Sequence, residues 1–305
     1  MNQTEPCGVL VVNKHAGVTS HDVVGMIRKL YETRRVGHTG TLDPMATGVL
    51  TVLIGRAAKA AEYLAADRKT YHATLRLGMT SDTEDSTGTI LTTSDAIPSP
   101  EQVQAILPRF RGSILQTPPM YSALKVNGQK LVDLARRGET VERQLREISI
   151  LSLEAEPLAT PTDYRLSVVC SGGTYIRTLC ADIGAALGCG GLMASLERTE
   201  SGCFSIRGSH SVEELSAMTA EERLACLLSM ESLFRDLPSL GLSAFHEHLI
   251  RNGCAVAQRK LGNRDLPGTR LRLLDASGSF FALGEVTETE EEPAVKAVKL
   301  FVLPE

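Results

Sequence analysis

A single carboxylate stands in a stretch of the chain that could hold it rigidly and expose it. Asp43 lies within residues 37–48 (GHTGTLDPMATG), which contain three glycines and a proline. Glycines permit positive φ and let a ligand come close, while Pro44 fixes the turn and favours an extended backbone at Asp43. An aspartate held in this way suits nucleophilic or acid–base chemistry without a cofactor, although a simple Asp-Pro turn would have the same residues.

Two further segments place chemically capable side chains on regular elements. Tyr71 begins an alternating stretch, residues 71–78, which predicts a half-buried strand. Arg177 follows a glycine turn and falls in the first turns of a helix expected to run to about residue 187. The helix dipole disfavours a cation near the N-terminus. We therefore expect Arg177 to have a specific acidic partner.

Other catalytic and metal-binding patterns are missing from the sequence. There is no phosphate loop of Walker or dinucleotide spacing, and no serine nucleophile elbow or HExxH pattern. Residues 80–89 hold three acids without the spacing of an EF-hand, so we expect a solvated loop there. His246 and His248 lack further ligands at suitable spacing. The sequence therefore predicts neither a metal nor a cofactor.

Hydrophobic periodicity indicates the elements that must carry these residues. Residues 8–14 and 49–54 are apolar runs that predict buried strands, the second directly after the Asp43 loop. Ser20 is expected to cap a helix over residues 21–31. Further helices are expected over 56–67 and 211–233, and further strands over 148–158, 164–170 and 192–198. Together these elements predict an enzyme-like body with a mixed sheet.

Charge is distributed unevenly along the 305 residues. The net charge of −4 argues against a nucleic-acid partner, but electrostatic footprints are local. Residues 1–71 carry nine basic against six acidic residues, and acid is concentrated in the C-terminal third. A second basic stretch is either a nucleic-acid face or the outer side of a solvated helix. It comprises Lys125, Lys130, Arg136, Arg137, Arg143 and Arg146.

The cysteines and the N-terminus indicate the compartment. Seven cysteines without a CxxC pattern suggest neither a disulfide framework nor a zinc site. No signal peptide is recognisable, and no apolar run is long enough to span a bilayer. We expect a cytoplasmic protein without a membrane partner.

Five short motifs occur in order over roughly residues 8–205. They are NK with G-x-TS at 13–20, GHTGTLDP with A-x-G-x-L at 37–50, K-x-Y with T-x-DT at 69–83, P-x-MYSALK at 118–125 and CS-x-GTYIR at 170–177. This ordered set resembles the TruB family of tRNA pseudouridine synthases. Beyond residue 238, turn signals recur every eight to twelve residues, which is similar to the small PUA-like domain that ends bacterial members.

The resemblance implies an α+β fold with a mixed, mainly antiparallel central sheet flanked by helices. It implies a catalytic domain over residues 1–238, with an RNA-gripping insertion at about 109–146, and a β-rich PUA-like RNA-binding domain over 239–305. It also implies isomerisation of uridine 55 to pseudouridine in the T-stem-loop of tRNA, without a cofactor. We expect a monomer that uses no guide RNA.

The resemblance also assigns roles to individual residues. Asp43 would act as nucleophile or base, Arg177 would pair with it, and Tyr71 would stack on the flipped uracil where a proton leaves C5. Flipping the base out of a folded loop costs a few kcal/mol, and His38 would take its place. RNA binding would further involve Lys14, Lys69, Lys125, Lys130, Tyr175 and Leu196, of which Leu196 would wall the pocket.

Three other functions compete with this interpretation. A non-catalytic RNA-binding or tRNA-folding protein could use the same fold, although all three catalytic residues are present. An aspartate-dependent hydrolase would need a second carboxylate, and position 45 is Met. A guide-RNA-dependent relative would carry long basic extensions, whereas this chain has an acidic C-terminal third.

Overall fold

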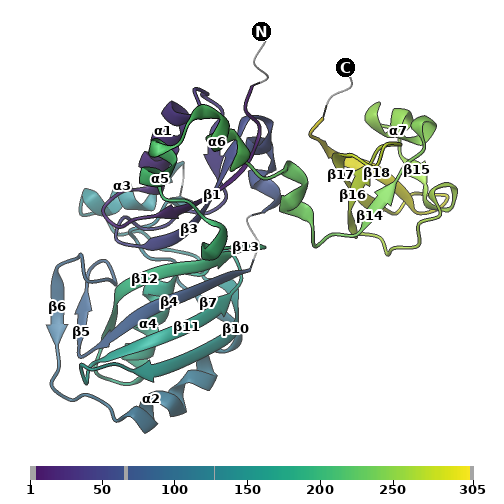
Figure 1. The fold of residues 1–305 in the computed structure, drawn as a ribbon. Coiled ribbons are helices and arrows are strands. Elements are labelled where there is room, and N and C mark those ends of the chain that lie inside the picture. Colours follow the sequence, from purple (N-terminus) through teal and green to yellow (C-terminus); the bar gives the residue numbers. More distant parts are fainter. Residues whose placement is uncertain (1–4, 65–67, 127, 303–305) are drawn as a thin grey trace.

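The computed structural model describes residues 5–64, 68–126 and 128–302 of the chain. Its body is built on one large mixed sheet with helices against it (Figure 1). Neighbouring strands run antiparallel except β3 and β12, which are parallel. The strand order is β1 (Gly8–Lys14), β3 (Thr47–Ile54), β12 (Gly191–Ser201), β4 (Lys69–Leu77), β11 (Asp163–Cys170), β10 (Arg146–Pro157) and β7 (Gly112–Gln116), with β2 (Val36–His38) beside β3 and β13 (Phe204–Ser205) beside β12. The expected mixed, mainly antiparallel sheet is confirmed.

Strand burial follows the sequence pattern. β3 is apolar on both faces and buried from Gly48 to Ile54, as expected for a strand inside the body. β4 alternates between buried and more exposed positions, and Tyr71 is on its buried side. Helix α4 (Ile176–Ala186) packs against β12 and β4 and covers one face of the sheet there with its buried apolar side chains. The sheet and this helix thus bring Tyr71 and Arg177 to one side of the body.

Helix α1 (Ser20–Leu30) begins one residue earlier than expected. Thr19 is its N-cap, in a capping box with Asp22. The prediction that Ser20 caps this helix was therefore wrong. Thr19 takes that role because its extended backbone aims the hydroxyl at the free N–H groups, which leaves the Ser20 hydroxyl available for another contact.

Two predicted helices differ in form. The alanine-rich stretch is the 3₁₀ helix η1 (Gly55–Tyr63), whose period of three residues puts Ala57 and Ala60 on one buried side. The end of the predicted helix, residues 65–67, lies outside the described residues. The expected helix 211–233 is broken because Thr219 caps a second helix. The segment consists of α5 (Val212–Ala217), α6 (Ala220–Ala225) and the 3₁₀ helix η4 (Met230–Phe234).

The remaining elements of the body are short. The hairpin β5 (Met79–Ser81) and β6 (Ile90–Thr93) follows β4, and a second small hairpin precedes α3. The list is completed by α2 (Pro100–Ile106), η2 (Leu107–Phe110), β8 (Lys125–Val126), β9 (Gln129–Lys130), α3 (Leu131–Arg136) and η3 (Ile206–Gly208). None of the helices in the described ranges has the length and apolar character needed to span a membrane.

The C-terminal part forms its own small sheet beside the body (Figure 1). It has a separate apolar core, and it joins the body through the rings of Phe234, Phe280 and Phe301, whose centroids are 5.6–5.8 Å apart. The expected small β-rich C-terminal domain is thus present. Its strands run in the order β14 (Ser239–Gly241), β16 (Arg270–Leu274), β17 (Phe280–Thr287), β18 (Ala294–Leu300) and β15 (Val256–Ala257), with helix α7 (Ala244–Arg251) and the 3₁₀ helix η5 (Gln258–Leu261).

Candidate active site

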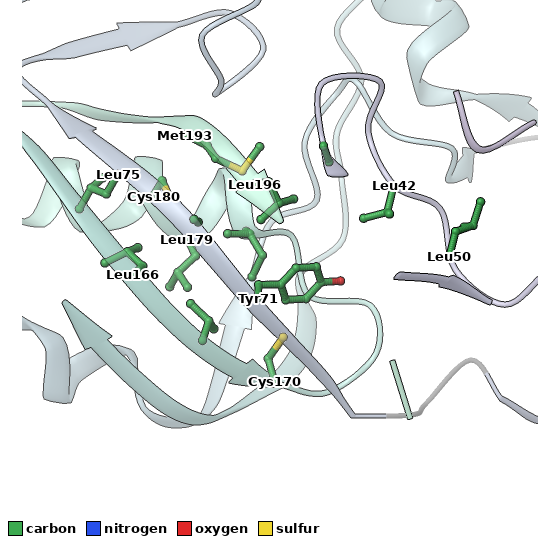
Figure 2. Packing of buried hydrophobic residues seen from close by; sticks show 14 of the residues in the cluster. Leu42, Leu50, Tyr71, Leu75, Leu166, Cys170, Leu179, Cys180, Met193 and Leu196 are labelled. Atoms are coloured by element: carbon green, nitrogen blue, oxygen red, sulfur yellow. The ribbon is translucent and has the colours of Figure 1, made fainter. Parts of the chain in front are cut away.

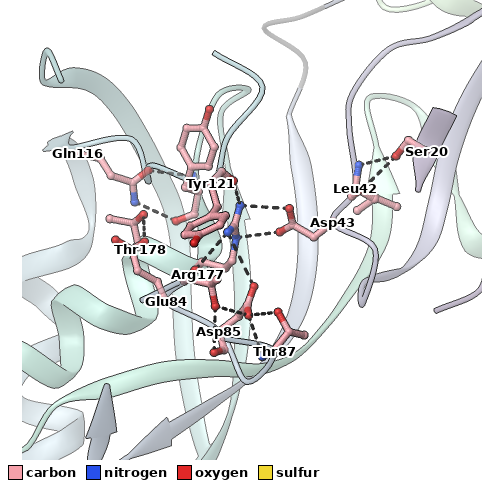
Figure 3. A network of polar contacts seen from close by, with 12 residues as sticks. Ser20, Leu42, Asp43, Glu84, Asp85, Thr87, Gln116, Tyr121, Arg177 and Thr178 are labelled. Atoms are coloured by element: carbon pink, nitrogen blue, oxygen red, sulfur yellow. Dashed lines mark hydrogen bonds and ion pairs between the residues drawn. The ribbon is translucent and has the colours of Figure 1, made fainter. Parts of the chain in front are cut away.

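The loop between β2 and β3 carries Asp43 directly onto Arg177, in the first turn of α4 (Figure 3). Asp43 Oδ2 lies 2.9 Å from Arg177 Nε, and Arg177 Nη2 donates to Asp43 Oδ1 at 3.1 Å. Such a paired contact fixes the plane of the carboxylate as well as its charge. The acidic partner expected for Arg177 is therefore Asp43.

A second carboxylate reaches the same guanidinium. Asp85 Oδ2 lies 3.8 Å from Arg177 Nη1, while the backbone carbonyls of Thr83 and Tyr121 accept hydrogen bonds from Nη1 and Nη2 at 3.2 and 2.9 Å. Asp85 is buried, and its Oδ1 accepts bonds from the Thr87 N–H and hydroxyl at 2.9 and 2.6 Å. Arg177 is thus held from several sides and cannot swing away from Asp43.

The acidic loop of residues 80–89 is therefore not simply solvated, and that prediction was wrong at two positions. Besides Asp85, the Glu84 carboxylate accepts a hydrogen bond of 2.5 Å from the Thr178 hydroxyl on α4. Glu84 adopts a φ of 63°, a conformation rare for a side-chain-bearing residue. The turn directs these acids inward because α4 supplies their partners.

Two buried polar side chains each hold one backbone segment of the site. The Ser20 hydroxyl accepts from the Leu42 N–H at 2.8 Å and donates to the Leu42 carbonyl at 3.1 Å. The Gln116 amide does the same for Tyr175, with bonds of 2.8 and 3.0 Å. Leu42 directly precedes Asp43 in the chain. These contacts satisfy buried backbone groups that would otherwise be unpaired, and they fix both sides of the Asp43–Arg177 pair.

Lys14 secures the other end of the Asp43 loop. Its ammonium donates to the backbone carbonyls of His15, Pro44 and Ala46 at 2.8, 3.2 and 2.6 Å. The side chain is fully buried at the end of β1. Lys14 therefore lies beneath the loop, where it supports the backbone after Asp43.

Burial and neighbouring charges shift the pKa values of the site's titratable groups in opposite directions. Burial raises the pKa of the Asp43 carboxyl above its ordinary value, and the Arg177 guanidinium is the strongest opposing influence. Burial lowers the pKa of the Lys14 ammonium to about 8, against the attraction of Asp43. Burial also raises the pKa of the Tyr71 phenol, which Arg198 opposes. Groups perturbed in this way cluster at functional sites.

Asp43, Tyr71 and Arg177 line a cavity of about 340 Å³. The ring of Tyr71 forms one wall, and Leu196 and Leu42 lie around it (Figure 2). The predicted site residues that line the cavity are Asp43, Lys69, Tyr71, Tyr175, Arg177 and Leu196. No group of three metal-binding side chains occurs among the described residues.

Four predicted RNA-binding residues lie outside the lining. Lys14 is beneath the loop, and His38 is in β2, where its Nδ1 is buried without a hydrogen-bond partner among the described atoms. Burial lowers the pKa of His38. Lys125 and Lys130 face each other on the exposed hairpin of β8 and β9. The structure therefore brings the catalytic candidates together, buries Lys14, and leaves Lys125 and Lys130 on the surface.

Sequence reasoning missed Arg198. This arginine is fully buried in β12, and its Nε and Nη2 donate to the carbonyls of Val49 and Gly40 at 2.7 and 3.0 Å. A Cβ at Gly48 would meet the Arg198 backbone at 2.2 Å, so glycine is required there. Arg198 stands between the acidic residues Glu197 and Glu200 at the polar end of the strand, so its sequence neighbours gave no sign of its burial, and its partners lie far away in the chain.

Comparison with known proteins identifies the family. Residues 28–176 match the family model of the TruB family pseudouridylate synthase N terminal domain, and residues 177–235 match that of the tRNA pseudouridylate synthase B C-terminal domain. The tRNA pseudouridine synthase B of Francisella tularensis subsp. tularensis (strain WY96-3418) is 46% identical over 237 residues, 77% of this chain and 78% of that protein. The corresponding protein of Francisella philomiragia subsp. philomiragia (strain ATCC 25017) is also 46% identical, with the same coverage.

Solved structures agree with the sequence relatives. A chain in the crystal structure of a Cbf5-Nop10-Gar1 complex superposes with a TM-score of 0.75 at 26% identity, covering 97% of this chain and 85% of that one. A chain of the archaeal box H/ACA sRNP Nop10-Cbf5 complex has the same fold, with a TM-score of 0.71 at 22% identity, covering 98% and 87%. By its family matches, its relatives and its five ordered motifs, the chain belongs to the TruB family of pseudouridylate synthases.

Proposed function

We propose that this enzyme isomerises uridine 55 to pseudouridine in the T-stem-loop of tRNA, with Asp43 as its catalytic carboxylate. The observation that carries the proposal is the cavity in which the Asp43–Arg177 pair and Tyr71 meet. The relatives at 46% identity are named as tRNA pseudouridine synthases, which supports tRNA as the substrate. In the reaction the N–C glycosidic bond breaks, the uracil rotates, and a C–C bond forms.

Asp43 acts on the nucleotide as nucleophile or base, and Arg177 keeps it in position. Burial alone would favour the neutral acid, so the guanidinium beside it is needed to retain a reactive carboxylate. The paired geometry also fixes both carboxylate oxygens against the guanidinium, and both residues line the cavity. A preorganised charge in a site of low polarity is worth far more than the same charge in water.

The cavity walls suit a flipped base. Tyr71 supplies an aromatic face for stacking, worth roughly 1–3 kcal/mol, and Leu196 and Tyr175 enclose the base from other sides. We assign His38, at the edge of the loop, to the space that the uracil leaves in the RNA. Extrusion costs a few kcal/mol, which these contacts offset.

Basic side chains near the cavity hold the RNA backbone. Lys69 lines the cavity itself, and Lys125 and Lys130 project from the exposed hairpin within the insertion at about 109–146. Lys14 contributes from beneath the loop through its charge and its hold on the backbone. We further propose that residues 1–238 form the catalytic domain and residues 239–305 a PUA-like RNA-binding domain.

Tritium release tests the proposal. Unmodified tRNA transcripts carrying [5-³H]uridine are incubated with the wild type, with Asp43→Asn, and with Ser211→Ala as a control outside the cavity. We expect release from the wild type and from Ser211→Ala, none from Asp43→Asn, and none from a transcript with cytidine at position 55. If the wild type binds tRNA but releases no tritium, the protein is a non-catalytic tRNA-binding protein; release by Asp43→Asn would overturn the role of the carboxylate.

A further inference from the structure

Arg198 is the largest fully buried side chain of the described protein, and it lines the cavity beside Tyr71. Within the described residues it has no carboxylate partner, and its charge is met by the carbonyls of Val49 and Gly40. A buried cation is costly without a compensating negative group. The Asp43–Arg177 ion pair described above does not involve Arg198. The burial of Arg198 therefore needs another explanation.

Arg198 and Tyr71 are direct neighbours across two strands. They stand opposite each other in the antiparallel pairing of β12 and β4, so their side chains share one face of the sheet. The Tyr71 hydroxyl points out of the sheet toward the segment that carries Leu42 (Figure 2). This is the same segment whose Gly40 carbonyl Arg198 holds. The Arg198 guanidinium and the Tyr71 hydroxyl are therefore both directed at the segment of residues 40–42.

The Asp43 loop also leaves room for this guanidinium. A Cβ on Gly40 would come within 3.4 Å of Arg198 Nη1 and of Lys69 Cε. That is closer than most Cβ contacts, so a larger residue would press on the arginine. The glycines at positions 40 and 48 thus both lie against Arg198.

We propose that Arg198 is a positioning residue that acts through Tyr71: it orients the phenol toward the uracil and favours the phenolate that removes the C5 proton. The proposal rests on the proposed function and adds a residue to it. Three titratable groups act on the phenol, namely Arg198, Cys170 and Asp43, and Arg198 is the cation among them. Burial raises the pKa of Tyr71, and the Arg198 guanidinium opposes that rise.

The proton transfer balances with water as the co-reactant. After the new C–C bond forms, the C5–H bond breaks and its proton passes to the phenolate oxygen of Tyr71. The electron pair forms the C5=C6 bond, and the electrons of the N1=C6 bond return to N1, which takes a proton from water. The hydroxide left behind removes the proton from Tyr71 and restores the phenolate.

An isotope effect separates this role from a purely structural one. Single-turnover conversion of a T-stem-loop RNA is followed with [5-¹H]- and [5-²H]uridine at position 55, using the wild type, Arg198→Lys and Arg198→Met. The matched control is Arg76→Lys, since Arg76 also lies on the central sheet but pairs with Asp163 outside the cavity. Pseudouridine formation by the wild type is the reference, so a wild type without activity would refute the proposed function rather than this inference.

We expect Arg198→Met to be slower by roughly tenfold, the change for one pKa unit of a base, and Arg198→Lys to be slower by less, because it keeps the charge and loses only the placement of the guanidinium. They should show a primary isotope effect larger than that of the wild type and of Arg76→Lys. Combined with Tyr71→Phe, Arg198→Lys should add little further loss. A slower rate without an increased isotope effect, or additive losses, would overturn the proposal. Arg198→Lys keeps the positive charge, so it carries the test if Arg198→Met loses its fold.

Discussion

Asp85 lies 3.8 Å from Nη1 of Arg177, the guanidinium whose Nε and Nη2 face Asp43. Two carboxylates therefore share one buried cation. Asp85 is anchored in its own turn by Thr87, so it can restrain Arg177 from the far end of the fork. The orientation of Asp43 thus depends on a residue that does not line the cavity.

Asp85→Asn should lower kcat by roughly tenfold, with little change in KM, because Arg177 loses one of its two restraining charges while the shape of the side chain is kept. Steady-state rates over a range of tRNA concentrations measure kcat and KM separately. Asp82→Asn is the matched control, because Asp82 is exposed in the same loop. Equal rates for Asp85→Asn and the control would contradict this restraint.

Ser20→Ala should lower both the stability of the protein and its kcat. The substitution leaves the Leu42 N–H and carbonyl without their hydroxyl partner, at a cost of about 1–3 kcal/mol in unfolding free energy. Because Leu42 precedes Asp43, we also expect a lower kcat. Ser211→Ala removes a helix cap at about 1 kcal/mol and should leave kcat unchanged. Urea unfolding measures the loss of stability of each variant, and initial rates at saturating tRNA measure its kcat. Equal kcat values for Ser20→Ala and Ser211→Ala would contradict a role of Ser20 in positioning Asp43.

Lys14 should make stability depend on pH in the alkaline range. Its pKa is about 8 in the folded protein and 10.5 in the unfolded chain. Between these values the unfolded state binds more protons, so the folded state gains stability as the pH rises from about 8 to 10.5. Below about pH 8 the whole cost of burying the charge, at most about 3 kcal/mol, is present.

Comparison with Lys14→Met isolates this contribution, since other groups titrate equally in both proteins. Urea unfolding at several pH values should show that the wild type gains stability relative to Lys14→Met as the pH rises through this range. If the difference in unfolding free energy between the two proteins stays constant from pH 7 to 10.5, folding does not lower the pKa of Lys14, and this prediction is wrong.

Removing surface lysines should change the salt dependence of tRNA binding. Lys125→Ala and Lys130→Ala should each weaken binding and reduce the slope of log K against log salt by about 0.7–0.9, the value for one phosphate contact. The rate at saturating tRNA should stay the same, because both side chains are exposed on the hairpin outside the cavity. Lys59→Ala, an exposed lysine on η1, should leave the slope unchanged. An unchanged slope in all three variants would exclude the hairpin from backbone contact.

Local rules were enough for some parts of the site. The alternation of residues 71–78 predicted that Tyr71 lies on a half-buried strand, and the helix dipole predicted a partner for Arg177. Both inferences depend on backbone geometry within a few residues. The antiparallel sheet and the β-rich C-terminal part followed from the family resemblance and from turn spacing.

Other parts depended on contacts that no local pattern contains. In the sequence Asp85 has the appearance of a solvated acid in a loop, because its partner Arg177 comes from the distant helix α4. Thr19 has the capping-box spacing to Asp22, which marks it as the cap, but only the position of Leu42 assigns the Ser20 hydroxyl to the loop. Arg198 reads as one of several charged residues at the end of its strand, and its partner Gly40 is 158 residues earlier.

These long separations have a kinetic consequence. Asp43 and Arg177 are 134 residues apart in the chain, and the Gln116 clamp spans 59 residues. Contacts of this kind close late, because chain entropy must be lost before they form. During refolding, secondary structure should therefore return before activity, and recovery of turnover would time the final closure of the central sheet.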